Sequence, residues 1–209
     1  MPMTMNQVIH GAVRRDLNRL DSALETFPAG DTRRAADLER GYAFLHGQLT
    51  HHHEDEDRLI WPALAKLGVE HLLLEEMESE HHAMSEGLAE TATAMTTLGR
   101  AADAGAAQEA LASVRRTRAV VDRHLEHEEQ ELEPALEPHL ETPEWKDVEK
   151  QLRKQPIGDA GVFLAWIQDG MEPDHRAYLR STIPPPVLAI VPAIFGRSYK
   201  SRVAPIWRR

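Results

Sequence analysis

Apolar residues recur every three or four positions through the first two thirds of the chain, which is the spacing of amphipathic helices. We expect four such helices, over residues 8–24, 31–65, 70–98 and 106–140. Turn-forming residues separate them: Pro-Ala-Gly-Asp after the first, Leu-Gly after the second and the glycine-bounded segment 99–105 after the third. Pro134 and Pro138 kink the fourth helix or end it early. The pattern therefore predicts an all-α protein, an antiparallel up-down four-helix bundle.

The chain changes character after residue 142. Seven of the thirteen prolines and three of the four tryptophans follow Pro143. Short helices are expected over residues 145–154, 160–171, 173–180 and 187–195. The last apolar run is shorter than the about 20 residues that cross a bilayer, and contact of this basic end with a membrane surface is a minority interpretation. We therefore divide the chain into a bundle at 1–142 and a C-terminal helical or irregular extension at 143–209, which packs on the bundle or on a partner.

Ionisable residues interrupt the apolar stripes at matching positions in the two halves of the chain. The second helix carries His-x3-Glu and then Pro six residues later, and the fourth helix repeats this spacing seventy-two residues on. Residues four apart lie on one face of a helix, so each pair aims an imidazole and a carboxylate at the same point. One further histidine lies on the stripe of the first helix and one on that of the third. The six inward-pointing residues are His10, His52, Glu56, His81, His124 and Glu128.

Six ionisable groups at core positions need a partner that offsets the cost of burying them. A pair of cations does this, with the two glutamates as bridges and the four histidines as terminal ligands, two to each metal. Helical bundles build such sites from side chains on facing helices, and imidazole with carboxylate suits first-row transition metals. The sequence therefore predicts a dinuclear metal site, with no separate catalytic residue and no organic cofactor.

The His-x3-Glu spacing is not specific by itself. It also occurs at His71, His82 and His127, where we interpret the pairs as solvent-facing. The histidines beside the proposed ligands are expected to point elsewhere, into outer or solvated positions: His51, His53, His82 and His127. Rotation of a helix would instead let His53 with Glu54, or His127 with Glu131, replace the chosen pair. Surface positions are expected for His46, His71, His139 and His175.

Composition narrows the classes of function. A formal net charge of −10 disfavours binding to nucleic acid or to an anionic membrane. The chain has no cysteine, which excludes disulfides and thiolate metal sites and fits a reducing compartment. Its first residues form no apolar run of the signal-peptide kind. A soluble, cytoplasmic protein is therefore expected.

Three motifs together resemble a known family. They are His52-x3-Glu56-x2-Leu59-x2-Pro62, Glu80-His81-x2-Met84-x3-Leu88 and His124-x3-Glu128-x5-Pro134. In this order they are similar to the hemerythrin-like (HHE cation-binding) family, most of all its bacterial members, over about residues 6–138. The resemblance implies two non-haem iron ions with carboxylate and oxo bridges, held in a four-helix bundle by the six residues already named.

The chain departs from the oxygen-carrying hemerythrins at two places. Those proteins have a fifth histidine four residues after the one on the third helix, where this chain has Ser85. Their fourth helix carries His-x4-Asp in place of His-x3-Glu. The missing imidazole leaves a coordination position for water, an exogenous ligand or another protein oxygen, for which Tyr42, Glu54 and Glu131 are candidates. Reversible oxygen carriage is therefore not expected.

An iron centre with open positions suits reaction with small oxidants. The expected function is to bind and turn over hydrogen peroxide, oxygen or nitric oxide, as a catalase-like or nitric-oxide-related oxidoreductase. The alternative is an oxygen- or iron-sensing module without turnover, which acts through a homo-oligomer or a regulatory partner at the C-terminal segment. A ferritin-like oxidase is disfavoured, although its Glu-x2-His motif occurs at Glu78 and Glu172. The remaining interpretations are a metal-free bundle and a site loaded with zinc, manganese or copper.

Overall fold

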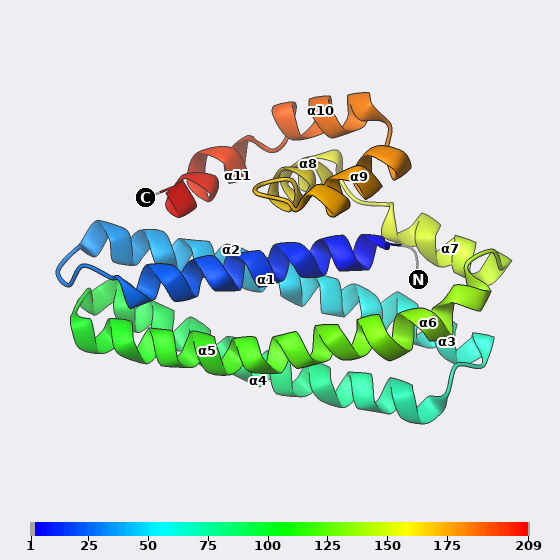
Figure 1. Cartoon of the computed structure of the whole chain (residues 1–209), viewed down its shortest axis with the longest axis horizontal. Coiled ribbons are helices and arrows are strands. Elements are labelled where there is room, and N and C mark those ends of the chain that lie inside the picture. Colours follow the sequence, from blue (N-terminus) through cyan, green and yellow to red (C-terminus); the bar gives the residue numbers. More distant parts are fainter. Residues whose placement is uncertain (1–2, 209) are drawn as a thin grey trace. The chain divides into compact units, whose positions relative to one another are not determined.

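The structure, a computed structural model, describes residues 3–208 as helices joined by short turns, with no strand among them (Figure 1). These residues form two compact units. One unit joins the chain up to Arg19 with the chain from Gln155 onward, and the other is Leu20–Lys154. The all-α prediction is confirmed. This grouping differs from a division at residue 142, and the division into a bundle at 1–142 and an extension at 143–209 stays a prediction.

Three long helices form the frame of the Leu20–Lys154 unit: α2 (Thr32–Asp55), α4 (His71–Ala101) and α5 (Ala104–His127). Helix α4 packs against both α2 and α5. The carboxylate of Asp31 caps α2 by accepting a hydrogen bond from the Arg34 amide, and Asp103 caps α5 in the same way. Such caps satisfy amides that have no partner within the helix. The predicted turn at 99–105 is thus shorter than expected.

Helices α2 and α5 each continue into a π-helical segment, Glu56–Ile60 (η1) and Glu128–Leu132 (η2). Short α-helices follow, α3 (Trp61–Leu67) and α6 (Glu133–Leu136), and a 3₁₀ turn, Glu137–His139 (η3), ends the second series. The sequence predicted an unbroken helix over residues 31–65 and a kink or an early end near Pro134, but it did not predict the π-helical segments.

Proline explains the widened turns. Pro62 has no amide hydrogen, and in an α-helix its ring would press on the carbonyl four residues earlier. The amide of Trp61 instead donates to the carbonyl of Glu56, five residues earlier. The amide of Glu133, just before Pro134, donates to Glu128 in the same way. Each π segment therefore begins at a glutamate of the repeat and closes directly before a proline.

An apolar cluster fills the unit next to these segments. It consists of Trp61, Ala63, Leu64, Leu74, Met77, Leu132, Trp145 and Val148. The last two come from α7 (Pro143–Leu152), which packs on α3. The first ten residues beyond the predicted bundle thus contribute to its core.

The other unit combines the first three quarters of α1 (Met5–Glu25) with the C-terminal helices. These are α8 (Ile157–Ile167), α9 (Pro173–Thr182), α10 (Pro185–Ile194), α11 (Arg197–Arg202) and the 3₁₀ turn η4 (Ala204–Arg208). Helix α8 packs against α10 and α11. A Cβ on Gly161 would lie 2.3 Å from the Cβ of Phe195, so this close packing requires glycine. No helix within residues 3–208 is long and apolar enough to cross a bilayer.

A buried carboxylate holds this unit together. Asp16 is fully buried and accepts hydrogen bonds from Trp166 Nε1 at 2.8 Å and from Arg15 and Arg19 at 2.9 Å. Arg19 also reaches Asp169, which accepts the hydroxyl hydrogen of Tyr199 at 2.9 Å. Burial of a charge is tolerated only where it is paired and hydrogen-bonded, and here the pairing links α1 to α8 and α11.

Candidate metal centre

Five of the six predicted ligands meet in the Leu20–Lys154 unit. Nε2 of His52 lies 3.3 Å from Oε1 of Glu56, and the other oxygen of this carboxylate, Oε2, lies 3.5 Å from Nε2 of His81. Nε2 of His124 lies 3.6 Å from Oε2 of Glu128. The rings of His81 and His124 have their centroids 4.7 Å apart. The stripes of α2, α4 and α5 thus place imidazoles and carboxylates in one volume.

Burial and mutual repulsion set the charges of these groups. Burial raises the pKa of the Glu56 carboxyl well above its ordinary value, and the neighbouring Glu128 carboxylate raises it further. Burial lowers the pKa of His124, because the interior disfavours the imidazolium. Neutral imidazole is the form that binds a metal. Burial thus disfavours charge both on the His124 imidazole and on the Glu56 carboxyl, and a bound cation would offset the charge of the carboxylates.

Carboxylates outside the centre fix the orientation of two imidazoles. Oδ1 of Asp57 lies 2.8 Å from Nδ1 of His81, and Oε2 of Glu80 lies 2.8 Å from Nδ1 of His124. A carboxylate accepts only, so Nδ1 of each ring carries the hydrogen and Nε2 is left with its lone pair toward the centre. The other oxygen of Glu80 lies 3.0 Å from Nδ1 of His127. These partners are typical of histidines that bind a metal.

Replacing Glu80 with alanine is expected to weaken iron(II) binding by about 10-fold to 100-fold, the usual effect of losing such a partner. The substitution frees the His124 ring to rotate and to exchange its tautomer. Competition with a chelator of known affinity measures the change. Glu78→Ala is the matched control, because Glu78 is exposed on the same helix. Equal affinities of the two variants would show that Glu80 does not orient the centre.

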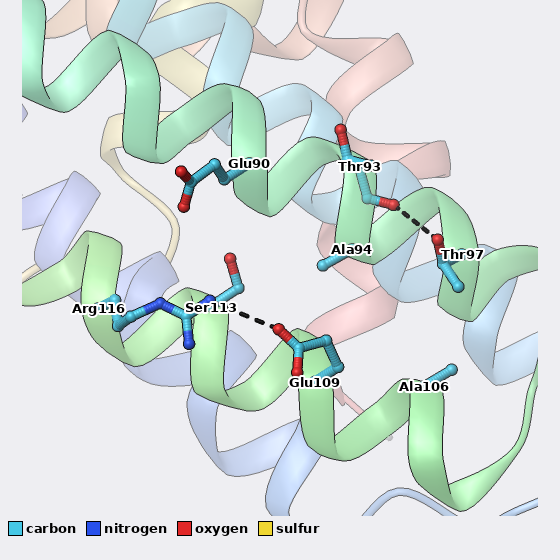
Figure 2. A pocket seen from close by; sticks show the side chains of 8 residues that line it. All are labelled: Glu90, Thr93, Ala94, Thr97, Ala106, Glu109, Ser113 and Arg116. Carbon is cyan, nitrogen blue, oxygen red and sulfur yellow. Dashed lines mark hydrogen bonds and ion pairs between the residues drawn. The ribbon is translucent and has the colours of Figure 1, made fainter.

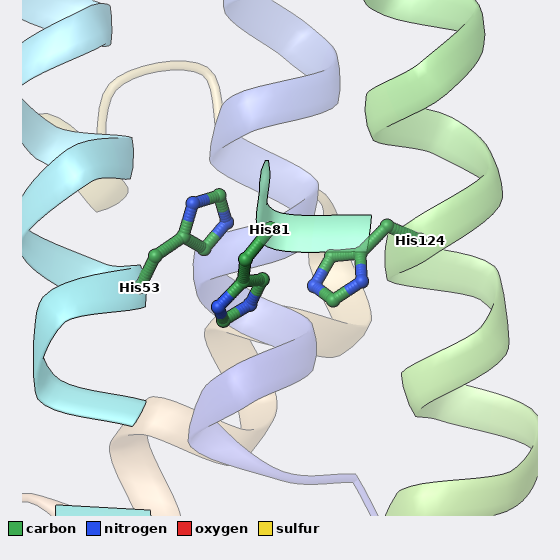
Figure 3. A group of neighbouring side chains, drawn as sticks. All are labelled: His53, His81 and His124. Atoms are coloured by element: carbon green, nitrogen blue, oxygen red, sulfur yellow. The ribbon is translucent and has the colours of Figure 1, made fainter. Parts of the chain in front are cut away.

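His10 and His53 differ from the other histidines. His10 is fully buried on α1 and belongs to the other compact unit, so its place among the ligands stays a prediction. His53 was expected to point away from the centre. Instead it is 8% exposed, and one of its ring nitrogens lies within 4.8 Å of ring nitrogens of His81 and His124 (Figure 3). A signal was present, because His53 lies four residues after Leu49 and three before Glu56, on the edge of the stripe.

The other candidate oxygen donors lie away from the centre or are engaged elsewhere. Tyr42 is buried, but its hydroxyl donates to the carbonyl of Leu88 at 2.6 Å. Glu54 is exposed. The Glu131 side chain is 63% exposed and lies 3.7 Å from His127 Nε2. The structure therefore gives no support to any of these three as the additional ligand.

Replacing Tyr42 with phenylalanine is expected to lower the free energy of unfolding by about 1 kcal/mol, the net contribution of one buried hydrogen bond, and to leave the amount of bound iron unchanged. Burial raises the pKa of this hydroxyl, so it stays protonated at neutral pH and acts as a donor. Denaturant unfolding and metal analysis of the same preparation check both parts. A loss of iron would contradict the assignment of Tyr42 to the frame.

The donors present fit a bound cation. Nε2 of His53, His81 and His124 is buried and makes no hydrogen bond with the described residues, although two of these atoms lie near the carboxylates already named. Buried polar atoms without hydrogen bonds are rare in proteins. A transition-metal ion would satisfy all three nitrogens and offset the two buried glutamates.

A family model described as the hemerythrin HHE cation-binding domain matches residues 7–148. The chain belongs to the hemerythrin family. No curated protein and no solved structure matches it. Membership in this family indicates cation binding, typically of iron, and the clustered histidines and glutamates of this hemerythrin-family protein could hold a metal ion.

A surface hollow on this hemerythrin-family protein shares no residue with the metal centre. It has a volume of about 380 Å³ and lies over α4 and α5 (Figure 2). Its lining consists of Glu90, Thr93, Ala94, Thr97, Ala106, Glu109, Ser113 and Arg116. Several of its polar groups bind one another: Arg116 donates to Glu109 at 3.5 Å, and the hydroxyl of Thr97 donates to the carbonyl of Thr93 at 3.0 Å. The hollow therefore offers no second cluster of metal ligands.

Proposed function

We propose that this protein holds two iron ions within an antiparallel up-down four-helix bundle and uses them to turn over a small oxidant: hydrogen peroxide, oxygen or nitric oxide. The proposed ligands are His10, His52, Glu56, His81, His124 and Glu128. One observation carries the proposal of two ions. The two oxygens of the Glu56 carboxylate face imidazoles on different helices, His52 on α2 and His81 on α4. A carboxylate placed in this way is suited to bridge two cations.

The residues of the chain supply binding, charge and orientation, and bound iron would supply the exchange of electrons with the oxidant. Glu56 and Glu128 offset the charge of the cations, and carboxylate ligands accommodate both ferrous and ferric iron. Asp57 and Glu80 hold the rings of His81 and His124 in the tautomer that exposes Nε2.

Apolar side chains beside the centre favour a small substrate. The ring centroid of Trp61 lies 5.5 Å from that of His81, and Trp61 belongs to the apolar cluster that continues to Trp145. A hydrophobic wall next to a metal ligand limits the access of water and of large polar molecules. Hydrogen peroxide and diatomic gases are small enough to reach a centre with such a lining.

Metal analysis and turnover assays test the proposal. The protein, loaded with iron(II) under anaerobic conditions, is expected to retain two irons per chain after gel filtration. It is then expected to consume hydrogen peroxide or nitric oxide faster than free iron at the same concentration. His82→Ala is a suitable control, because His82 is exposed beside His81 on α4. Two irons without turnover would overturn the oxidoreductase and leave a sensing or iron-binding module, whereas no retained iron would overturn the centre itself.

A further inference from the structure

We propose that His53 is a ligand of the metal centre and supplies the fifth imidazole that Ser85 cannot. This inference rests on the proposed function. With His53, three histidines from three helices, His53 on α2, His81 on α4 and His124 on α5, would bind one of the two cations.

The geometry of the three rings supports a shared cation. Figure 3 shows the imidazoles of His53, His81 and His124 converging from their separate helices. One ring nitrogen of each lies within 4.8 Å of the others. Small side-chain rotations bring such atoms to the separation of about 3 Å that two nitrogens adopt on one ion at metal–nitrogen bonds of about 2.1 Å.

The chemical environment of His53 is costly unless it binds something. The side chain is buried, Nε2 makes no hydrogen bond with the described residues, and the ring is stacked on His81 with centroids 4.3 Å apart. A buried polar atom without a hydrogen bond costs about 1–3 kcal/mol. A metal bond would satisfy this atom, and no group among residues 3–208 accepts or donates a hydrogen bond to it.

The other candidate donors are exposed or engaged elsewhere, which supports His53 as the additional ligand. The hydroxyl of Tyr42 is used by the Leu88 carbonyl, Glu54 is exposed and Glu131 lies beside His127 at the surface. His53 is therefore the buried candidate that remains for the additional position. The two cations would then differ in their ligands, because His53, His81 and His124 would give one of them three imidazoles.

Metal titration of a variant tests this inference. His53→Ala is expected to bind the second of two cobalt(II) ions about 100-fold more weakly or worse, since losing even an outer partner of a metal ligand costs about 10-fold to 100-fold. The first ion should bind as in the unchanged protein. His51→Ala is the matched control, because the His51 side chain is 59% exposed on the same helix. Added imidazole should enter the vacated space and restore the cobalt absorption spectrum.

A second variant separates coordination from packing. His53→Leu keeps an apolar shape and removes the buried nitrogen, so it should raise the melting temperature of the metal-free protein and lower that of the metal-loaded protein. A histidine needed only for packing would lower both or change neither. If the unchanged protein binds two ions and His53→Ala binds them equally well, the inference on His53 fails and the proposed function stands. If the unchanged protein binds no metal, both fail.

Discussion

Replacing Glu56 with glutamine is expected to reduce the retained iron from two ions per chain to one or none. The carboxylate faces His52 with one oxygen and His81 with the other, and an amide can neither offset the charge of two cations nor bridge them equally. Metal analysis after gel filtration measures the loss. Glu54→Gln is the matched control, because Glu54 is exposed two residues away on the same helix and should keep both ions.

The same substitution is expected to stabilise the metal-free protein, by an amount that grows with pH. The raised pKa of Glu56 means that its stabilising contribution is complete below the ordinary pKa of 4.5 and is lost as pH rises through the folded-state value. Glutamine stays neutral, so the advantage of the variant should be small at pH 5 and larger at pH 8. Urea unfolding of chelator-treated protein at both values checks the sign. If the difference in unfolding free energy between the two proteins instead shrinks toward pH 8, the pKa of Glu56 is not raised in the folded protein.

Replacing Asp16 with alanine is expected to have the largest effect on stability, a loss of about 3 kcal/mol, because it removes the buried acceptor that two arginines and an indole N–H share. Such a loss lowers the melting temperature by about 10 °C in a protein of this size. Three groups converge on Asp16: Arg15, Arg19 and Trp166. Thermal unfolding followed by circular dichroism measures the effect.

Asp21→Ala provides the comparison for Asp16. Asp21 lies on the same helix and is also paired, at 2.8 Å from Arg115, whose guanidinium lowers the pKa of this carboxyl. The Arg115 side chain is 46% exposed. Exposed pairs contribute about 0–1 kcal/mol, so Asp21→Ala should change stability little. Equal losses for the two variants would show that burial does not govern the strength of the Asp16 network.

Local patterns were sufficient to predict most of the helices and to select most of the residues that meet in the candidate centre. The stripe through Leu45, Leu49 and His52 and the matching stripe on α5 identified the two His-Glu pairs that meet in the candidate centre, because residues three and four apart share a helix face whatever the rest of the chain does. Family membership, predicted from the three motifs, is confirmed.

Features that depend on contacts between distant segments were missed. The place of His53 depends on how α4 and α5 approach α2, which spacing along α2 does not determine. The grouping of α1 with residues beyond Gln155 depends on the pairing of Asp16 with Trp166. The short helix α11 was not predicted either, because its six residues carry no repeating pattern long enough to detect.

The prolines that follow the π segments determine the backbone of the centre even in the absence of metal. The nitrogen of proline cannot donate a hydrogen bond, whether or not metal is bound. Pro62 and Pro134 should therefore prevent the π-helical segments from becoming regular α-helix when the metal is removed. We therefore expect the backbone positions of Glu56 and Glu128 to be set by the prolines and not by the bound cation. Binding and release of the metal ions should therefore cause little change in the far-ultraviolet circular dichroism spectrum, because the helices do not refold.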